Sequence, residues 1–130
     1  MEIAYSLLVN GVPKAQPRPR MTAGGHVYNP LSADAWKEKI KAAFAARRRP
    51  VITGPVRLEV TFFMPVPKRM KINEFTPHVK KPDTDNLLKA VMDSLTEIGV
   101  WKDDAQVYET LAGKYYAGKE TGAQIIVETF

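Results

Sequence analysis

The sequence predicts an α+β fold, in which two main helices pack on one mixed β-sheet in a two-layer α/β arrangement. Two observations support this expectation. Segments with the two-residue period of strands lie near both ends and in the middle of the chain, at about 2–9, 55–64, 105–117 and 123–130. Segments with a helical period lie between them, at about 33–47 and 85–98. The predicted order is strand, hairpin, helix, strand, helix, strand, strand.

The first strand, at 2–9, places Ile3, Tyr5 and Leu7 on one face. The run PKAQPRPR follows this strand. Its three prolines exclude a helix, so we expect an extended backbone there. The turn Ala23-Gly24-Gly25 then joins two short segments, which we expect to form a hairpin. These segments are Arg20–Thr22 and His26–Tyr28.

The first helix has Ser32 as its expected N-cap and an apolar stripe made by Trp36, Ile40 and Phe44. Pro50 prevents its extension. The strand at 55–64 alternates apolar and polar residues, which indicates one buried face. The residues at 65–82 have four prolines and five Lys/Arg, and we expect a long exposed basic loop there.

The second helix has a carboxylate near its start, in Asp83 or Asp85, that can act as a cap. Its predicted buried stripe is Leu88, Val91, Met92, Leu95 and Ile98. Gly99 ends the helix, because glycine readily adopts the left-handed conformation found after helix ends. Two closing strands follow, joined by a turn at Gly118 to Gly122.

Length and composition indicate a folded protein with one domain, residues 1–130. The chain has no cysteine, which excludes disulfides, zinc–thiolate sites and thiol nucleophiles. It shows no signal peptide and no apolar run long enough to span a membrane, so we expect a cytoplasmic protein. The net charge of +5 and the pI near 9.5 favour polyanionic partners, nucleic acid above all.

Acidic residues are concentrated in one short stretch of this basic chain. Five of the six aspartates lie within 81–104. Residues 1–82 carry fifteen Lys/Arg and five Asp/Glu, a net charge of +10, whereas residues 83–130 carry four and nine, a net charge of −5. Like charges packed together repel each other, and binding a cation relieves that cost.

The spacing of these aspartates permits a metal site. Asp85, Lys89 and Asp93 recur every four residues and therefore share one helix face. The chain turns back after Gly99, which brings Asp103 and Asp104 near the helix. Oxygen ligands without His or Cys suit Mg²⁺ or Mn²⁺, ions that activate water and neutralise a phosphate under attack. A plainer reading is also open, in which these residues are caps, a Lys–Asp ion pair and a turn.

The stretch Lys81–Val107, KPDTDNLLKAVMDSL…GVWKDDAQV, resembles the signature of the RusA family of Holliday-junction resolvases. The opening PKAQPRPRMTAGGHVYNP is also similar to that family's proline- and arginine-rich start and short hairpin. The resemblance implies a Mg²⁺-dependent endonuclease that acts as a homodimer on branched DNA. It assigns metal binding and catalysis to Asp83, Asp85 and Asp104, and a catalytic lysine to Lys89.

The resemblance also reaches residues around this group. Asp103, Asp93 and Asn86 match family positions with a supporting or structural role, and Asp103 remains an alternative to Asp104. Some family members have arginine just before the first aspartate, where this chain has Pro82. Basic residues around the site are candidates for holding phosphates. They are Lys14, Arg18, Arg20, Lys68, Arg69, Lys71, Lys80 and Lys81.

The leading hypothesis is an endodeoxyribonuclease that resolves Holliday junctions in DNA recombination and repair. A symmetric dimer would place one acidic site on each of two opposed strands and make paired nicks. The alternatives are a metal-dependent nuclease for flaps, forks or other branched DNA, and a non-catalytic basic DNA-binding module. A fourth and weaker alternative is an RNA-binding protein.

Overall fold

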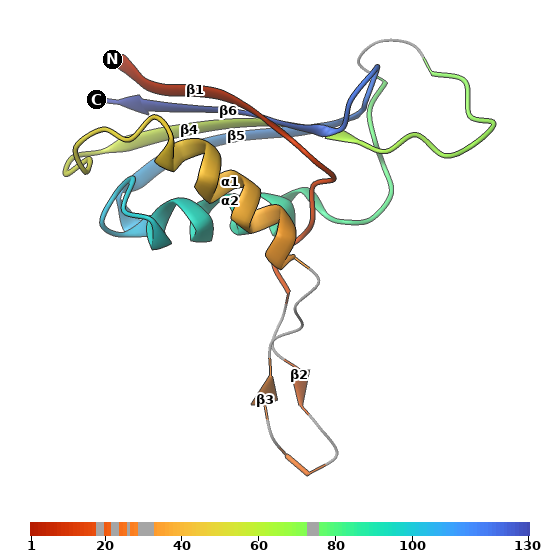
Figure 1. Cartoon of the computed structure of the whole chain (residues 1–130), viewed down its shortest axis with the longest axis horizontal. Helices are drawn as coiled ribbons and strands as arrows, with labels where there is room; N and C mark the ends of the chain where they lie inside the picture. The colour runs from red at the N-terminus through yellow and green to blue at the C-terminus, as the bar shows by residue number, and fades with distance from the viewer. Residues whose placement is uncertain (18–19, 22–23, 26, 29–32, 73–75) are drawn as a thin grey trace.

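The computed structural model describes residues 1–17, 20–21, 24–25, 27–28, 33–72 and 76–130, with only the backbone at 20–21 and 27–28. The elements follow the predicted order and confirm the α+β fold (Figure 1). They are β1 (Glu2–Asn10), β2 (Arg20–Met21), β3 (Val27–Tyr28), α1 (Asp34–Ala45), β4 (Val56–Met64), α2 (Thr84–Glu97), the 3₁₀ turn η1 (Asp104–Gln106), β5 (Val107–Tyr116) and β6 (Gly122–Thr129).

The main sheet is mixed, with strand order β1-β6-β4-β5. β6 is antiparallel to both β1 and β4, whereas β4 and β5 are parallel. Val56 of β4 pairs with Val107 of β5, and Met64 pairs with Tyr116. Because parallel neighbours need a crossover, α2 runs back across the sheet between them. Both helices cover the same face of the sheet (Figure 1).

The core lies between this sheet face and the two helices. The predicted stripe of α1 is confirmed, since Trp36, Ile40 and Phe44 are all buried. The buried face of β4 alternates as predicted, with Leu58 and Phe62 among its fully buried side chains. Together these side chains form one hydrophobic cluster with residues of α2, β1 and β6. The cluster fixes how α2 lies on the sheet, and α2 carries the predicted site.

Two details of the predicted burial are wrong. Ile3 is 59% exposed, because the register of β1 shifts between Ile3 and Tyr5 and turns its side chain off the buried face. The stripe of α2 is also displaced. Leu88, Met92 and Ile98 are only partly buried and pack at the margin of the core. The fully buried residues are Leu87, Ala90, Val91, Ser94 and Leu95.

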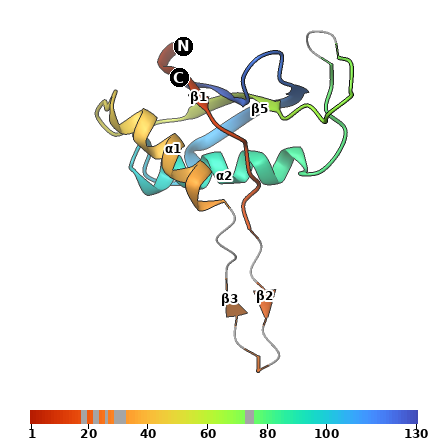
Figure 2. The ribbon, with the colours of Figure 1, turned by 45° about the vertical axis from the view of Figure 1, so that its right-hand side comes forward.

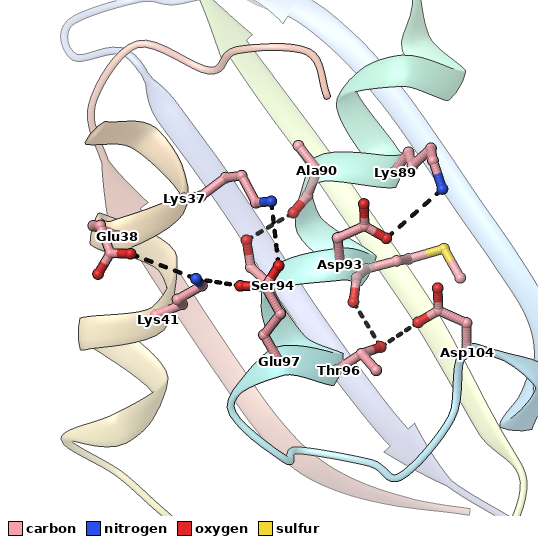
Figure 3. Close-up of polar contacts among 11 residues, drawn as sticks. Lys37, Glu38, Lys41, Lys89, Ala90, Asp93, Ser94, Thr96, Glu97 and Asp104 are labelled. Carbon is pink, nitrogen blue, oxygen red and sulfur yellow. Dashed lines mark hydrogen bonds and ion pairs between the residues drawn. The ribbon is translucent and has the colours of Figure 1, made fainter. Parts of the chain in front are cut away.

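The displaced stripe has a physical reason. α2 packs against α1 as well as the sheet, so its buried arc includes small residues at the close approach. Ser94 fits there because its hydroxyl donates to the Ala90 carbonyl at 2.7 Å. Between the helices, Lys37 and Lys41 of α1 pair with Glu97 of α2 (Figure 3).

The predicted hairpin is confirmed in its paired residues, since Arg20 lies opposite Tyr28 and Met21 opposite Val27. It projects away from the sheet and helices in both views (Figures 1 and 2). Ser32, the expected cap of the first helix, lies outside the described residues. Gly99 has the predicted left-handed conformation, with φ of 78°. No described helix has the length and apolar character needed to cross a membrane.

Candidate active site at the two ends of α2

The first part of the predicted site lies where α2 begins, beyond the carboxyl end of β4. Two contacts hold this start in place. Lys114 of β5 donates from Nζ to the carbonyl of Pro82 at 2.7 Å. The backbone N–H of Gln16, in the segment after β1, donates to the Asn86 carbonyl at 3.0 Å. In Figure 2 this segment passes across α2. The helix start is therefore held by β5 and by the N-terminal segment.

Asp83 and Asp85 are both exposed at this end of α2. Asp83 occupies the N-cap position, yet its side chain makes no capping hydrogen bond. Asp85 lies in the first turn, and its carboxylate accepts a hydrogen bond from the neighbouring Asn86 N–H at 2.9 Å. The plainer reading of Asp83 as a helix cap thus has no hydrogen bond to support it. Both carboxylates remain accessible from solvent.

Lys89 and Asp93 lie further along α2. Their side chains pair at 3.7 Å across one helical turn, as the spacing predicts (Figure 3). Lys89 is exposed, whereas Asp93 is half-buried. An exposed pair of this kind contributes little to stability, about 0.3–0.5 kcal/mol. The pair therefore holds the ammonium group of Lys89 only weakly.

The second part of the predicted site is the turn after α2. Asp103 accepts a hydrogen bond from the Ala105 N–H at 2.8 Å. Gln106 Oε1 accepts from the Asp103 N–H at 2.9 Å, so the two residues cap η1 reciprocally. The reading of Asp103 as a turn residue is supported by these bonds.

Asp104 is bonded to the end of α2 rather than to its start. Its Oδ1 accepts a hydrogen bond from the Thr96 hydroxyl (Figure 3). It also accepts one from Trp101 Nε1 at 3.3 Å. Trp101 is fully buried, and its Nε1 also donates to Thr96 Oγ1 at 2.7 Å. The Asp104 carboxylate thus belongs to a small network that holds the tryptophan.

The structure does not bring Asp104 to the two aspartates at the helix start. Thr96 follows Asp85 by eleven residues, which corresponds to about 16 Å along a helix that rises about 1.5 Å per residue. Within the described ranges, no three His, Asp or Glu side chains are grouped so that they could hold a metal ion. Shared metal binding by Asp83, Asp85 and Asp104 stays a prediction.

The predicted phosphate-binding residues are spread over two segments. Lys68, Arg69 and Lys71 are exposed in the loop after β4, and Lys80 and Lys81 are exposed just before α2. Lys14 is exposed in the segment after β1. Arg18 lies outside the described residues, and only the backbone of Arg20 is described. Among the described residues of this set, Lys14, Lys80 and Lys81 lie beside the start of α2.

His78 is a residue that sequence reasoning left without a role. It is 8% exposed, and its ring packs on that of Tyr116 with centroids 4.9 Å apart. Burial, and then the charge of Lys114, lower the pKa of His78 below its ordinary value. Its Nδ1 is buried without a hydrogen-bond partner among the described residues. A lone histidine in a proline-rich loop gave no signal of this burial.

Comparisons with known proteins identify the family of the chain. The family model described as endodeoxyribonuclease RusA matches residues 10–128. The uncharacterized protein YqaN of Bacillus subtilis (strain 168) is 32% identical over 123 residues, covering 84% of this chain and 85% of that protein. These matches extend over nearly the whole chain and include both ends of α2.

Two named enzymes match over a shorter length. Crossover junction endodeoxyribonuclease RusA of Escherichia coli (strain K12) is 42% identical over 52 residues, covering 40% of this chain and 42% of that protein. The protein of the same name from Enterobacteria phage 82 is 42% identical over 59 residues, covering 45% and 47%. The chain thus aligns with less than half the length of these two enzymes.

Proposed function

Because the chain belongs to the RusA family of endodeoxyribonucleases, we propose that it cuts branched DNA and resolves Holliday junctions. The observation that carries the proposal is the pair of exposed carboxylates at the start of α2, in a basic chain of this family. Asp83, at the N-cap position, makes no capping hydrogen bond. The two matched enzymes named crossover junction endodeoxyribonucleases support it. The cut would be hydrolysis of a phosphodiester bond during DNA recombination and repair in the cytoplasm.

Asp83 and Asp85 fit a hard divalent ion. Mg²⁺ in proteins is usually held by one or two carboxylates, with water and substrate phosphate completing its shell. Two accessible carboxylates two residues apart meet that requirement. When bound, Mg²⁺ or Mn²⁺ would supply an activated water and neutralise charge on the phosphate. Lys89, one turn from Asp85, would hold a phosphate oxygen once it leaves Asp93.

Asp104 is the third ligand that the resemblance implies. Its bonds to Thr96 and Trp101 would have to change before it reached an ion at Asp83 and Asp85. Two copies of the chain in a homodimer would each present one site to opposed strands of a four-way junction, giving symmetric nicks. Flaps and forks are alternative substrates for the same site.

A second candidate is a non-catalytic DNA-binding module. The observation in its favour is the distance of about 16 Å along the helix between Asp85 and the residue that holds Asp104. In this case the aspartates would have structural roles only, without binding a metal, and the lysines would hold DNA. It predicts binding without cleavage in Mg²⁺ or Mn²⁺.

The test is incubation with a labelled immobile four-way junction, with and without Mg²⁺, followed by mapping of nicks. We expect paired symmetric nicks only with Mg²⁺, and their loss in Asp85→Asn with junction binding retained. The loss should be about 100-fold or more, because a metal supplies several kcal/mol and each ~1.4 kcal/mol is tenfold.

The matched control is Asp34→Asn, the same change at the one aspartate outside the cluster, which is exposed in the first turn of α1. It should cut like the original chain. Cleavage by Asp85→Asn at the normal rate would refute the assignment of the site. Tight binding with no nick in either metal would favour the non-catalytic module. Flaps and forks offered in competition identify the preferred shape.

A further inference from the structure

A pocket of about 490 Å³ opens beside the start of α2. The segment after β1, the end of β4 and the residues before α2 surround it. The residues that matter most for its chemistry are Pro13, Lys14, Met64, His78, Lys81 and Pro82. Its volume lies within the range of about 300–1,000 Å³ typical of small-molecule sites. It is therefore large enough for a ligand of nucleotide size.

The walls and the rim of this pocket differ in character. Pro13, Met64 and Pro82 give apolar surfaces, and His78 adds the small part of its side chain that is not buried. Lys14 and Lys81 are exposed and place two positive charges at the opening. No carboxylate occurs among its described lining residues. A flat ring with apolar faces that carries a phosphate is the ligand chemistry that matches this combination.

His78 provides an independent indication of a missing partner. More than nine-tenths of the residue is buried, and its Nδ1 has no hydrogen-bond partner among the described residues. Buried polar atoms are nearly always paired, so each exception calls for an explanation. The edge of a nucleic-acid base carries both donors and acceptors and would supply the partner.

The pocket is next to the proposed cutting site, because Lys81 and Pro82 directly precede Asp83. We propose that the pocket holds one unpaired nucleotide of branched DNA, extruded from the base stack beside the strand that is cut. Bases at a branch point have lost stacking partners and are the least costly to extrude. The proposal rests on the proposed function, and it names what that site recognises apart from phosphates.

The test uses immobile junctions with the fluorescent base 2-aminopurine at one position flanking the branch point, scanned position by position. Fluorescence is measured in EDTA, so that binding is followed without cleavage. We expect a rise on protein binding at one position, because the base leaves the stack. In Ala15→Phe, which fills the pocket from its wall, the rise should be lost while the Kd for the junction changes less than about threefold.

Ala42→Phe is the matched control, the same change at an exposed residue of α1 outside the pocket, and it should keep the rise. Val12→Trp is a second filling variant at a 42% exposed residue, in case Ala15→Phe does not fold. Circular dichroism checks the fold of each. No rise at any position, or an equal rise in the filled variants, would overturn the proposal.

The two proposals can fail separately. A chain that gives the pocket-dependent rise but never nicks a junction in Mg²⁺ would refute the nuclease and keep the pocket. A chain that makes paired nicks without any such rise would keep the nuclease and refute the pocket.

Discussion

The aspartates at the two ends of α2 differ in how their carboxylates contact the rest of the protein. At the start, the Asp83 carboxylate makes no capping bond, and that of Asp85 accepts only from its neighbour's N–H among the contacts described. After the helix, Asp103 caps a turn, and Asp104 accepts from Thr96 and Trp101. An exposed carboxylate that caps no turn can accept an external cation, whereas the donors to Asp103 and Asp104 already stabilise the fold.

This difference shows that acidic residues close in sequence can have different structural surroundings. The five aspartates of 81–104 are close in sequence, but their contacts differ. Asp83 and Asp85 are exposed and cap no turn, whereas Asp103 caps η1 and Asp104 contacts Thr96 and Trp101. The contrast between the two ends fails if Asp104 contributes as much to metal binding as Asp83. It is strengthened if changes at the helix start alter metal affinity and changes after the helix alter stability.

The largest expected effect is on metal affinity. Asp83→Asn should weaken Mn²⁺ binding to the chain, measured without DNA by calorimetry, by about tenfold or more, since even supporting groups of metal sites contribute 10–100-fold. Asp104→Asn should leave the affinity within about twofold. An equal loss in both variants would mean that Asp104 reaches the ion and that the turn after α2 rearranges.

The next effect is on stability and should fall on the other end of α2. Thr96→Val removes the hydroxyl that pairs with Trp101 Nε1 and Asp104, and should lower the free energy of unfolding by about 1–3 kcal/mol. Asp83→Ala, at an exposed side chain without a capping bond, should change it by less than about 0.5 kcal/mol. Urea unfolding measures both. A neutral Thr96→Val would show that this network does not hold Trp101.

The smallest effect concerns pH and the ion pair between the helices. The hydrogen bond from Lys41, and then the charges of Lys37 and Lys41, hold the pKa of Glu97 below its ordinary 4.5, while burial opposes them. The stability it contributes is therefore complete above pH of about 4.5 and is lost as pH falls through the lowered pKa. Because the Glu97 side chain is 49% exposed, we expect less than about 1 kcal/mol.

Glu97→Gln provides the comparison for this effect. It should be slightly less stable than the original chain at pH 7 and equal to it at the acid end, in urea unfolding followed over pH. A difference that persists unchanged below the lowered pKa would show that Glu97 acts by packing rather than by charge.

Local patterns were enough to predict most of the fold. The alternation of β4, the stripe of Trp36, Ile40 and Phe44, and the glycine after α2 each follow from residues close in sequence. The order of elements was confirmed for the same reason. The bulge near Ile3 was missed because it arises from pairing with β6, far along the chain. The rotation of α2 arises from packing against α1, which is also non-local.

The candidate site shows the same limit. The residues of the family signature were recognised, and their shared metal site stays a prediction that took no account of the parallel pairing of β4 and β5. A crossover between parallel strands starts at the carboxyl end of one and returns to the amino end of the next. Asp83 therefore lies beyond the carboxyl end of β4, whereas Asp104 lies at the other end of these strands, just before β5 begins. Burial of His78 depends on Tyr116 and Lys114, which no local pattern could indicate.

Gly122, the first residue of β6, lies against the end of β1, from which the segment beside the start of α2 continues. A methyl group placed on it would lie 2.4 Å from the Val9 carbonyl oxygen, a distance that real side chains do not tolerate. Any larger residue at this position would therefore push the end of β1 away from β6. The segment tethered to that end forms one side of the nucleotide-sized pocket and touches α2 through Gln16. The absence of a side chain at Gly122 therefore lets β1 and β6 pair closely, and this pairing positions the segment that lines the pocket.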